Sequence, residues 1–332
     1  MFSNYGDEIV SDKQYKIIIT DCDHPSVDIE RKILSNIHSQ LILESCRTEN
    51  EVIAVASDAD AIINQYAPFT RKVINALQKC KIISRYGVGV DNIDLHAATE
   101  KKIIIANVPD YCVDEVSTHA FSLILACARG ITILDRKIRE KKWDFTLVKP
   151  LFRTQGQIIG LFGLGKIARM VAQKASGFGL KVIAYDPYVS EADRNVELVT
   201  FNCLLSDSDF LSIHAPLTEE TKHIIGEKEL KMMKNTAYLV NTSRGSLIDE
   251  KSLYLALKEK WITGAALDVM EKEPPDWGNP LLSLDNLIIT PHISFYSEES
   301  YVELKTKTAE AVLSVLKGEI PRSVVNTQVL KR

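Results

Sequence analysis

A single stretch, from Gln157 to Ala168, constrains the fold of this chain more than any other part of its sequence. An apolar run typical of a buried strand, Ile158 to Phe162, leads directly into Gly163-Leu164-Gly165. A helical pattern begins at Lys166, immediately after the second glycine. A strand that passes through a glycine turn into a helix is the first half of a dinucleotide-binding unit.

The second half of that unit follows at the expected distance. Another apolar run, Lys181 to Tyr185, ends at Asp186, about twenty residues after the turn. A carboxylate at this place accepts hydrogen bonds from both ribose hydroxyls and repels a 2′-phosphate, so the sequence predicts NAD rather than NADP as the cofactor. Glycine turns also form ordinary strand–helix corners, but the two strands and the acid together favour a cofactor site.

Each residue of the turn has its own task in this interpretation. Gly163 permits the tight turn, and Gly165 lets the backbone approach a pyrophosphate. The amides of Lys166 and Ile167, at the start of the helix, favour the negative charge of that group. Ala168, in the third position of the fingerprint, is small enough for the helix to pack on the strand.

Charge and composition argue against several other classes of function. The 332 residues carry a net charge of -4, which gives no electrostatic case for binding nucleic acid or an anionic membrane. The longest apolar runs, such as Ser122 to Ala128, are far too short to span a bilayer, so no membrane contact is expected. Segment 1–13 is polar and acidic, which predicts no secretory signal.

The 6 cysteines predict a cytoplasmic protein with reduced thiols and no metal site. None forms a Cys-x-x-Cys pair, and no cysteine–histidine cluster has the spacing of a zinc site. Cys112 lies near a predicted joint between domains, although packing is the simpler interpretation of this residue.

Apolar strand-like runs alternate with helical periodicity along the chain, which predicts parallel sheets with helices on both faces. Strands are predicted at 16–20, 52–56, 81–85 and 103–106, and in the second half at 210–214, 237–241, 264–269 and 287–290. Helices are predicted at 27–39, 70–78, 113–141 and 298–316, the last of them ending at Gly318. About 150 residues precede the glycine turn, enough for a domain of their own.

Three polar side chains follow predicted strands of the second half: Arg244, Glu273 and His292. The carboxyl ends of parallel strands line the ligand crevice of an open α/β sheet, so these side chains are expected to share one site. Arginine can hold a carboxylate through two parallel hydrogen bonds, and histidine can exchange a proton with a carbonyl or alcohol near neutral pH. A glutamate beside the histidine would hold its ring in place.

With these residues the chain resembles the D-isomer-specific 2-hydroxyacid dehydrogenase family, from about Lys16 to Asn326. The resemblance rests on specific motifs: Arg85-Tyr-Gly-Val-Gly-Val-Asp-Asn92, Gly160 to Ala168, His214-Ala-Pro-Leu-Thr218, Asn241-Thr-Ser-Arg-Gly245, Leu267-Asp-Val269 with Glu273-Pro274, and Thr290-Pro-His292. Two segments, Asn107 to Asp114 and His292 to Glu298, are similar to the branch that contains the C-terminal-binding-protein corepressors and their bacterial enzyme relatives.

The resemblance implies two flavodoxin- or Rossmann-like domains, each a doubly wound parallel sheet, with a cleft between them. It also implies a homodimer built on the NAD-binding domains. The substrate domain is expected to be discontinuous, 1–109 plus 297–332, with the NAD-binding domain at 110–296. Closure of the cleft about joints near Pro109 and Phe295 is expected to assemble the complete site.

The family's roles carry over to the matching positions. Arg244 matches the arginine that binds the substrate carboxylate, His292 matches the acid/base, and Glu273 matches its carboxylate partner. Val88 and Gly89 match the loop whose amides hold the substrate carboxylate.

The resemblance also assigns cofactor and pocket residues. Asp268 matches the residue that orients the nicotinamide carboxamide, and Asp186 matches the ribose ligand. Phe295 is expected to line the substrate pocket and stands where the corepressor branch carries tryptophan, while Ser294 stands where glycine or alanine is frequent. The remaining predicted cofactor contacts are His214, Pro216, Thr221, Thr242 and Ser243.

The sequence therefore predicts an NAD-dependent oxidoreductase that transfers hydride between NADH and a small 2-keto acid, giving a D-2-hydroxy acid. One alternative is an NAD-binding scaffold that recruits protein partners, because corepressors of this branch can keep the catalytic residues. The other is an enzyme for a phosphorylated or aromatic hydroxy acid. A phosphate would need basic residues of the first domain, for which Arg71, Lys72 and Arg85 are the candidates.

Overall fold

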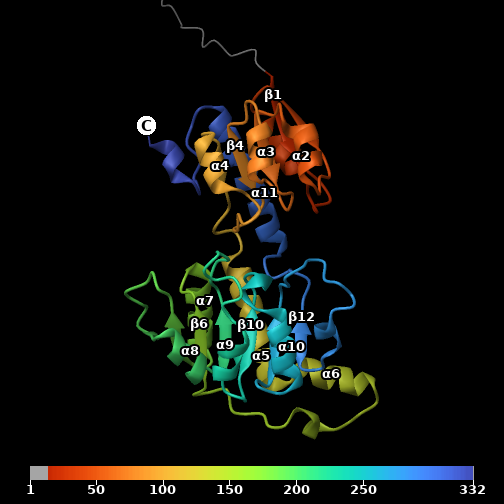
Figure 1. Cartoon of the computed structure of the whole chain (residues 1–332), viewed down its shortest axis with the longest axis vertical. Coiled ribbons are helices and arrows are strands. Elements are labelled where there is room, and N and C mark those ends of the chain that lie inside the picture. Colours follow the sequence, from red (N-terminus) through yellow and green to blue (C-terminus); the bar gives the residue numbers. More distant parts are fainter. Residues whose placement is uncertain (1–13, 332) are drawn as a thin grey trace, which may run out of the picture. The chain divides into compact units, whose positions relative to one another are not determined.

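The computed structural model of the chain describes residues 14–331, so the predicted polar segment 1–13 lies outside the described residues. The chain divides into two compact units (Figure 1). The first unit runs to Tyr111 and resumes at Glu298, and the second spans Cys112–Ser297. The sequence placed these changes of unit next to Pro109 and Phe295. Each unit contains one parallel sheet, which confirms the predicted fold class.

The first unit is built on a five-stranded sheet with the order β2-β1-β3-β4-β5. This is the order of flavodoxin-like sheets. Most of its strands are nearly continuous apolar runs, because helices cover both faces. Their bounds are β1 Tyr15–Ile19, β2 Ser39–Leu43, β3 Ala61–Asn64, β4 Ile82–Arg85 and β5 Ile104–Ala106.

Helices α2, α3 and α4 pack on one face of this sheet, around a core that contains Phe69 and Ile74. Helices α1 and α11 pack together, and α11 lies against β3 and β4. The C-terminal helix of the chain therefore completes the N-terminal unit, as Figure 1 shows. The helices are α1 Asp28–Leu34, α2 Glu49–Ala56, α3 Arg71–Ala76, α4 Leu95–Glu100 and α11 Glu298–Leu316, and a short 3-10 turn, η4, covers Thr327–Leu330.

One predicted strand is wrong, because residues 52–56 lie in helix α2. Thr48 accepts a hydrogen bond from the Glu51 amide, and the Glu51 carboxylate accepts one from the Thr48 amide, which together form a capping box. Within α2 only Val52 and Ala56 are buried, and residues four apart share one face of a helix. The helix predicted at 27–39 is also too long, since α1 ends at Leu34 and β2 begins at Ser39.

The second unit is built on a seven-stranded parallel sheet with the order β12-β11-β10-β9-β6-β7-β8. Counted from β6, this is the Rossmann order with one further strand, β12, at the edge. The order reverses between β6 and β9, which is the topological switch point where such sheets bind ligands. The strands are β6 Ile158–Phe162, β7 Lys181–Tyr185, β8 Val196–Leu198, β9 Phe210–Ile213, β10 Tyr238–Asn241, β11 Gly264–Leu267 and β12 Leu287–Ile289.

Two apolar cores lie on the two faces of this sheet. One contains residues of α5 and α7, and the other contains residues of α8, α9 and α10. The helices are α5 Val113–Arg129, α6 Ile131–Arg139, α7 Lys166–Gly177, α8 Phe201–Asp207, α9 Glu227–Met232 and α10 Glu250–Lys258, with 3-10 turns η1 Phe145–Val148, η2 Gly245–Leu247 and η3 Pro280–Ser283.

The single helix predicted at 113–141 is two helices, α5 and α6, which bend by 63°. Gly130 forms the break with φ of +60°, in the left-handed region that favours glycine. A Cβ at this position would also lie 2.7 Å from Val148. No single helix within residues 14–331 is long and apolar enough to cross a membrane. Within these residues, only the bent pair α5 and α6 reaches the necessary length and apolar composition, and only when its two helices are counted together.

Candidate active site

The glycine turn at the end of β6 has room on one side only. Gly163 has φ of +90°, and a Cβ there would lie 2.9 Å from both the Ala215 amide nitrogen and the His214 carbonyl carbon. A Cβ on Gly165, in contrast, would meet no heavy atom within 4 Å. The turn is therefore packed against the end of β9 through Gly163 and open at Gly165, which is the side the sequence assigns to a pyrophosphate.

Helix α7 begins at this turn with no side chain capping its N-terminus. Uncapped amides at a helix start attract an anion, because the peptide dipoles also leave partial positive charge there. Lys166 and Ile167, the two residues predicted to bind cofactor here, are the first two residues of α7. The geometry suits a phosphate group.

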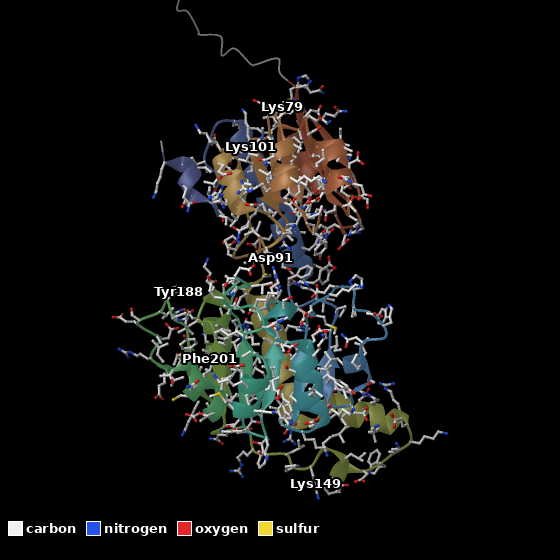
Figure 2. The ribbon with its side chains drawn as sticks, in the orientation of Figure 1. Lys79, Asp91, Lys101, Lys149, Tyr188 and Phe201 are labelled. Atoms are coloured by element: carbon white, nitrogen blue, oxygen red, sulfur yellow. The ribbon has the colours of Figure 1, made fainter. Side chains whose placement is uncertain are left out.

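Asp186 follows β7 and holds the loop around the turn. Its Oδ2 accepts a hydrogen bond from the Leu164 amide at 2.9 Å, and its Oδ1 accepts one from the Tyr188 amide at 2.9 Å. Each carboxylate oxygen retains a further lone pair, so both can still accept from ribose hydroxyls. Tyr188, labelled in Figure 2, exposes 95% of its surface beside this carboxylate.

Thr242 carries a buried hydroxyl for which the described part of the chain provides no hydrogen-bond partner. It follows β10 at the carboxyl edge of the sheet. A buried polar group without a partner is costly, and a ligand that supplies one removes that cost. The neighbouring Ser243 has its hydroxyl engaged, because it donates to the Ile213 carbonyl at 2.9 Å.

His214 and Thr221 shape the next loop along the edge. Burial lowers the pKa of His214 to about 4, so its ring is neutral at neutral pH. The ring Nε2 lies 2.9 Å from the Ser212 hydroxyl. Thr221 donates to the Pro216 carbonyl at 2.7 Å and accepts from the Thr218 amide at 2.8 Å, which ties the loop to itself.

These observations together fit a dinucleotide. The open side of Gly165, the uncapped start of α7, the Asp186 carboxylate and the orphaned Thr242 hydroxyl all belong to one edge of the sheet. The roles predicted for single residues toward the cofactor remain predictions.

His292 and Glu273 form the closest pair of titratable groups at this edge. The His292 Nδ1 lies 2.6 Å from the Glu273 Oε2, and the other Glu273 oxygen accepts a hydrogen bond from the Met270 amide at 3.0 Å. Both side chains are about one-third exposed or less, at 28% and 35%. Because Glu273 faces Nδ1, the ring presents Nε2 as its second nitrogen for proton exchange.

The backbone at His292 is left-handed, with φ of +51°. Such a conformation costs a non-glycine residue about 1–2 kcal/mol, so the surrounding structure must hold it. The His292 amide donates to the Asp268 carbonyl at 2.7 Å and to the Thr290 carbonyl at 3.0 Å. These two hydrogen bonds fix the backbone of His292 and so the position from which its side chain extends.

The Asp268 carboxylate, 1% exposed, organises the same loop. Its Oδ1 accepts from the Thr290 hydroxyl at 2.5 Å and from the Ile293 amide at 3.0 Å. Its Oδ2 accepts from the Ser294 amide at 2.9 Å. The sequence predicted a role for Asp268 toward nicotinamide, which remains a prediction. It did not reveal that this carboxylate binds residues on both sides of His292 and so fixes the loop that carries the histidine.

His119 of α5 is a further residue that the sequence did not reveal. Its Nε2 lies 3.0 Å from the Thr290 hydroxyl, and that hydroxyl gives its one proton to Asp268. The Nε2 of His119 must therefore be the donor in this contact. The hydrogen-bond series His119–Thr290–Asp268 thus links α5 to the loop that carries His292.

Arg244 follows β10, and its Nη1 donates to the Ser243 carbonyl at 2.8 Å. The next residue, Gly245, packs directly against the backbone of the segment that leads to Glu273. A Cβ on Gly245 would lie 1.9 Å from the Met270 carbonyl carbon and 2.3 Å from the Glu271 amide nitrogen. The arginine turn and the glutamate loop are thus in contact, and only glycine allows that approach.

The predicted substrate-binding residues fall in both units. Phe295 belongs to the second unit, where its ring meets the His292 ring at a centroid distance of 6.2 Å and an angle of 77°. Val88 and Gly89 follow β4 of the first unit. Their part in binding a carboxylate remains a prediction.

Three polar groups, His223, Asp249 and Glu271, come together elsewhere in the second unit, with ligand-type atoms within 4.8 Å of one another. Internal contacts already engage them. The His223 Nε2 lies 3.1 Å from Glu271, and Asp249 caps α10 by accepting from the Lys251 amide. The cluster thus consists of the His223–Glu271 contact beside the N-terminus of α10, where Asp249 is the cap. Sequence spacing gave no sign of it, because the three residues lie in separate loops.

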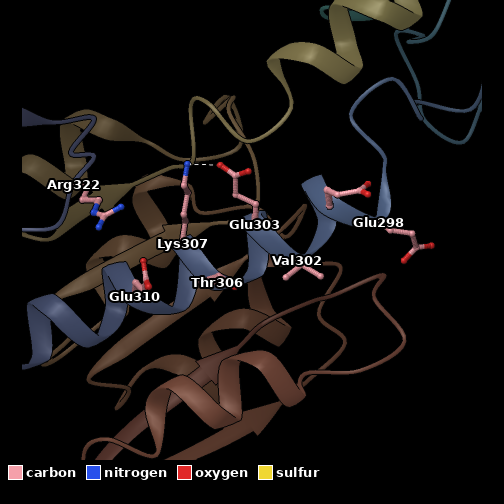
Figure 3. Close-up of a pocket in the computed structure, with 8 residues that line it drawn as sticks. Glu298, Val302, Glu303, Thr306, Lys307, Glu310 and Arg322 are labelled. Carbon is pink, nitrogen blue, oxygen red and sulfur yellow. Dashed lines mark ion pairs between the residues drawn. The ribbon is translucent and has the colours of Figure 1, made fainter.

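A hollow of about 640 Å³ runs along α11 in the first unit (Figure 3). Lys307 lies within it and pairs with Glu303 at 2.5 Å and with Asp110 at 2.8 Å. The lining residues include none of the predicted site residues; they are Glu298, Glu299, Val302, Glu303, Thr306, Lys307, Glu310 and Arg322.

Comparison with known proteins agrees with this geometry. The model of the family described as "D-isomer specific 2-hydroxyacid dehydrogenase, NAD binding domain" matches residues 121–294. A glyoxylate reductase of Korarchaeum cryptofilum is 39% identical over 323 residues, which cover 92% of this chain and 97% of that protein. The chain belongs to the D-isomer specific 2-hydroxyacid dehydrogenase family. It is thus an NAD-dependent dehydrogenase by family.

Two further relatives show how broad the family is. A D-3-phosphoglycerate dehydrogenase of Methanocaldococcus jannaschii is 42% identical over 316 residues, covering 94% of this chain but only 59% of that longer protein. The crystal structure of a D-lactate dehydrogenase from Aquifex aeolicus, complexed with NAD and lactic acid, superposes with a TM-score of 0.84 at 27% identity, covering 93% and 99% of the two chains. The branch of the family to which this chain belongs remains a prediction.

Proposed function

We propose that this dehydrogenase reduces a small 2-keto acid to the D-2-hydroxy acid with NADH. The observation that carries the proposal is the 2.6 Å contact between His292 and Glu273, on a loop held by the buried Asp268 carboxylate. A histidine whose Nδ1 is engaged by a carboxylate offers a proton at Nε2 in a defined direction. A carbonyl oxygen that becomes an alcohol needs that proton.

When bound, NADH supplies hydride to C2 of the keto acid. The chain's own residues perform the remaining tasks. Arg244 holds the substrate carboxylate and stabilises the charge that develops on the carbonyl oxygen. His292 then gives its Nε2 proton to that oxygen, and Glu273 keeps the ring oriented. In their predicted role, the backbone amides of Val88 and Gly89 would also donate hydrogen bonds to the substrate carboxylate.

A screen of 2-keto acids with NADH tests this proposal. The panel runs from glyoxylate and pyruvate through hydroxypyruvate to phenylpyruvate, with His292→Ala as the matched inactive variant. We expect turnover with the small acids and loss of about 10²–10⁴ in kcat in the variant, the usual contribution of a positioned acid. The NADH Kd should not change. Absence of turnover with every acid would refute the proposal.

A phosphorylated substrate is the second candidate, because a relative at 42% identity carries the name D-3-phosphoglycerate dehydrogenase. Basic residues that the sequence offered for a phosphate are engaged in ion pairs. Arg71 pairs with Glu100 at 2.6 Å, and Lys72 pairs with Glu49 at 3.3 Å. Adding 3-phosphohydroxypyruvate to the panel distinguishes the two candidates. The scaffold alternative gains no support from the relatives compared, all of which bear enzyme names.

We also propose that a second copy of the chain covers α6 and the segment after it. No residue of α6 is buried, although Ile131 and Ile138 are apolar and 54% and 46% exposed. Trp143 and Phe145, just beyond, are 92% and 71% exposed. Apolar side chains gathered in this way mark an interface.

Sedimentation or light scattering of the full chain tests the dimer. Trp143→Glu should shift the chain toward the monomer, because it places a charge in the apolar interface. Trp277→Glu is the matched control, since Trp277 is 83% exposed but lies outside this segment. A wild-type monomer, or equal shifts in both variants, would contradict the dimer.

A further inference from the structure

The first unit buries an ion pair between its first and last helices. Lys305 of α11 is 1% exposed, Glu30 of α1 is 0% exposed, and the Lys305 Nζ lies 3.4 Å from the Glu30 Oε2. Lys305 also donates to the Ser26 carbonyl and stands 5.1 Å from the centroid of the Tyr301 ring. Removing two charges from water often costs more than their attraction returns, so a buried pair is a poor device for stability alone.

The pair extends to a third residue, Tyr86. The Tyr86 hydroxyl donates to the Glu30 Oε1 at 2.6 Å, and Tyr86 is 2% exposed. Burial raises the pKa of Tyr86, so the phenol keeps its proton and acts as the donor. The ring of His24 packs edge-on against Tyr86 at 5.2 Å and against Tyr301 at 4.6 Å. These contacts allow the Tyr86 ring little freedom.

Tyr86 is directly followed by the loop that contains Val88 and Gly89. The loop begins at Gly87, whose φ of +137° is accessible mainly to glycine, so the backbone there is intrinsically permissive. Beyond Tyr86, the loop is anchored through its carbonyls. Gly87 accepts from the Val108 amide at 3.0 Å, and Val88 accepts from the Asn107 side chain at 2.7 Å.

We infer that the series Lys305–Glu30–Tyr86 is a positioning device for the loop at Val88 and Gly89. The inference rests on the proposed function, in which that loop holds the substrate carboxylate. Lys305 contacts Glu30 and holds its side chain in place, Glu30 accepts the hydrogen bond of the Tyr86 hydroxyl, and Tyr86 sets where the permissive Gly87 begins. A misplacement of about 1 Å in such a binding group can reduce activity by about 10²-fold.

Three variants separate positioning from simple packing. Tyr86→Phe removes only the hydroxyl, and we expect KM for the preferred keto acid to rise about tenfold, equivalent to ~1.4 kcal/mol, with kcat and the NADH Kd within about twofold of wild type. The double variant Glu30→Leu/Lys305→Met replaces both charges by apolar groups and should raise KM similarly while the protein stays folded. Glu30→Gln/Lys305→Met is also neutral but keeps an acceptor for Tyr86, and should restore KM.

Tyr15→Phe is the matched control. Tyr15 also donates its hydroxyl toward α11, to the Leu316 carbonyl at 3.2 Å, but it lies on β1 and does not precede the loop. Its KM should equal that of the wild type. An unchanged KM in Tyr86→Phe, or KM changes that follow only the loss of thermal stability across all variants, would overturn the inference.

Hydrogen exchange of the peptide 86–92 provides a readout that does not depend on turnover. Tyr86→Phe should speed exchange of this peptide relative to the wild type and to Tyr15→Phe, because local opening becomes easier when the anchor is lost. Equal exchange in all three proteins would also overturn the inference. A wild-type chain without turnover on any keto acid would refute the proposed function instead, and the exchange result would still decide whether Tyr86 fixes the loop.

Discussion

Replacement of Asp268 by asparagine tests whether the buried carboxylate holds the histidine loop. The carboxylate accepts three hydrogen bonds, from the Thr290 hydroxyl and from the amides of Ile293 and Ser294. An asparagine places an NH₂ group where one oxygen stood. Facing Ser294, that group loses one acceptor contact; facing Thr290 and Ile293, it loses two. The first orientation is therefore preferred.

The cost of the preferred orientation can be bounded. One hydrogen bond to a charged group is lost and one buried amide is left without an acceptor, which together cost about 1.5–3 kcal/mol. For a unit of this size, about 2–4 °C of Tm corresponds to each kcal/mol, so Tm should fall by about 3–12 °C. The displaced His292 loop should lower kcat by about 10–100-fold, because proton transfer depends on geometry.

Asp209→Asn provides the control for this experiment. Asp209 is another mostly buried carboxylate of the second unit; it accepts from the Ile158 amide at 2.8 Å and from Lys234 at 2.9 Å. This variant should lose thermal stability and keep kcat. The NADH Kd separates the two roles of Asp268, since a contact with nicotinamide predicts weaker NADH binding, whereas the loop role does not. Normal kcat in folded Asp268→Asn would refute the reasoning.

Four further outcomes are expected. NADH should be preferred over NADPH by at least about tenfold in kcat/KM, because Asp186 repels a 2′-phosphate; equal values would contradict its role. Arg244→Lys should raise KM and lower kcat, because an ammonium lacks the paired donors of a guanidinium. Gly245→Ala should lower Tm by an amount equivalent to about 1–3 kcal/mol, since its Cβ meets backbone, whereas Gly278→Ala, with no atom nearer than 3.5 Å, should not. Thermal stability should fall as pH drops from about 6.5 toward 4. In this range His214 is protonated in the unfolded chain but stays neutral in the folded chain, where its pKa is about 4. The His214→Gln variant should therefore lose less stability over the same range.

The dinucleotide unit could be predicted from sequence because each of its signals is local. The strand, the glycines and the acid act on neighbouring residues, so their spacing alone indicates the turn between β6 and α7. The strand predicted at 52–56 failed because a short apolar run fits both a strand and one face of a helix. The capping box of Thr48 and Glu51 was a local signal that could have identified the helix.

The placement of Arg244, Glu273 and His292 after strands of one sheet could be predicted, because parallel strands end at one edge of a sheet. Their support could not be predicted in this way. The contact from His119 through Thr290 to Asp268 joins residues separated by 171 and 22 positions, and it depends on how α5 packs behind the sheet. Sequence patterns specify faces and ends of elements, whereas such contacts depend on the distance between elements.

Buried charged residues show most clearly that sequence patterns do not specify contacts between distant elements. In the sequence, Glu30 and Lys305 are charged residues of helical segments, and most such residues lie on solvated faces. Their burial depends on the packing of α1 against α11, two helices separated by nearly the whole chain. The role inferred for Glu30 depends on its 2.6 Å hydrogen bond from the Tyr86 hydroxyl, at the start of the loop that contains Val88 and Gly89. Candidate catalytic residues can therefore be proposed from their motifs, whereas the residues that hold them in place have to be found in the structure.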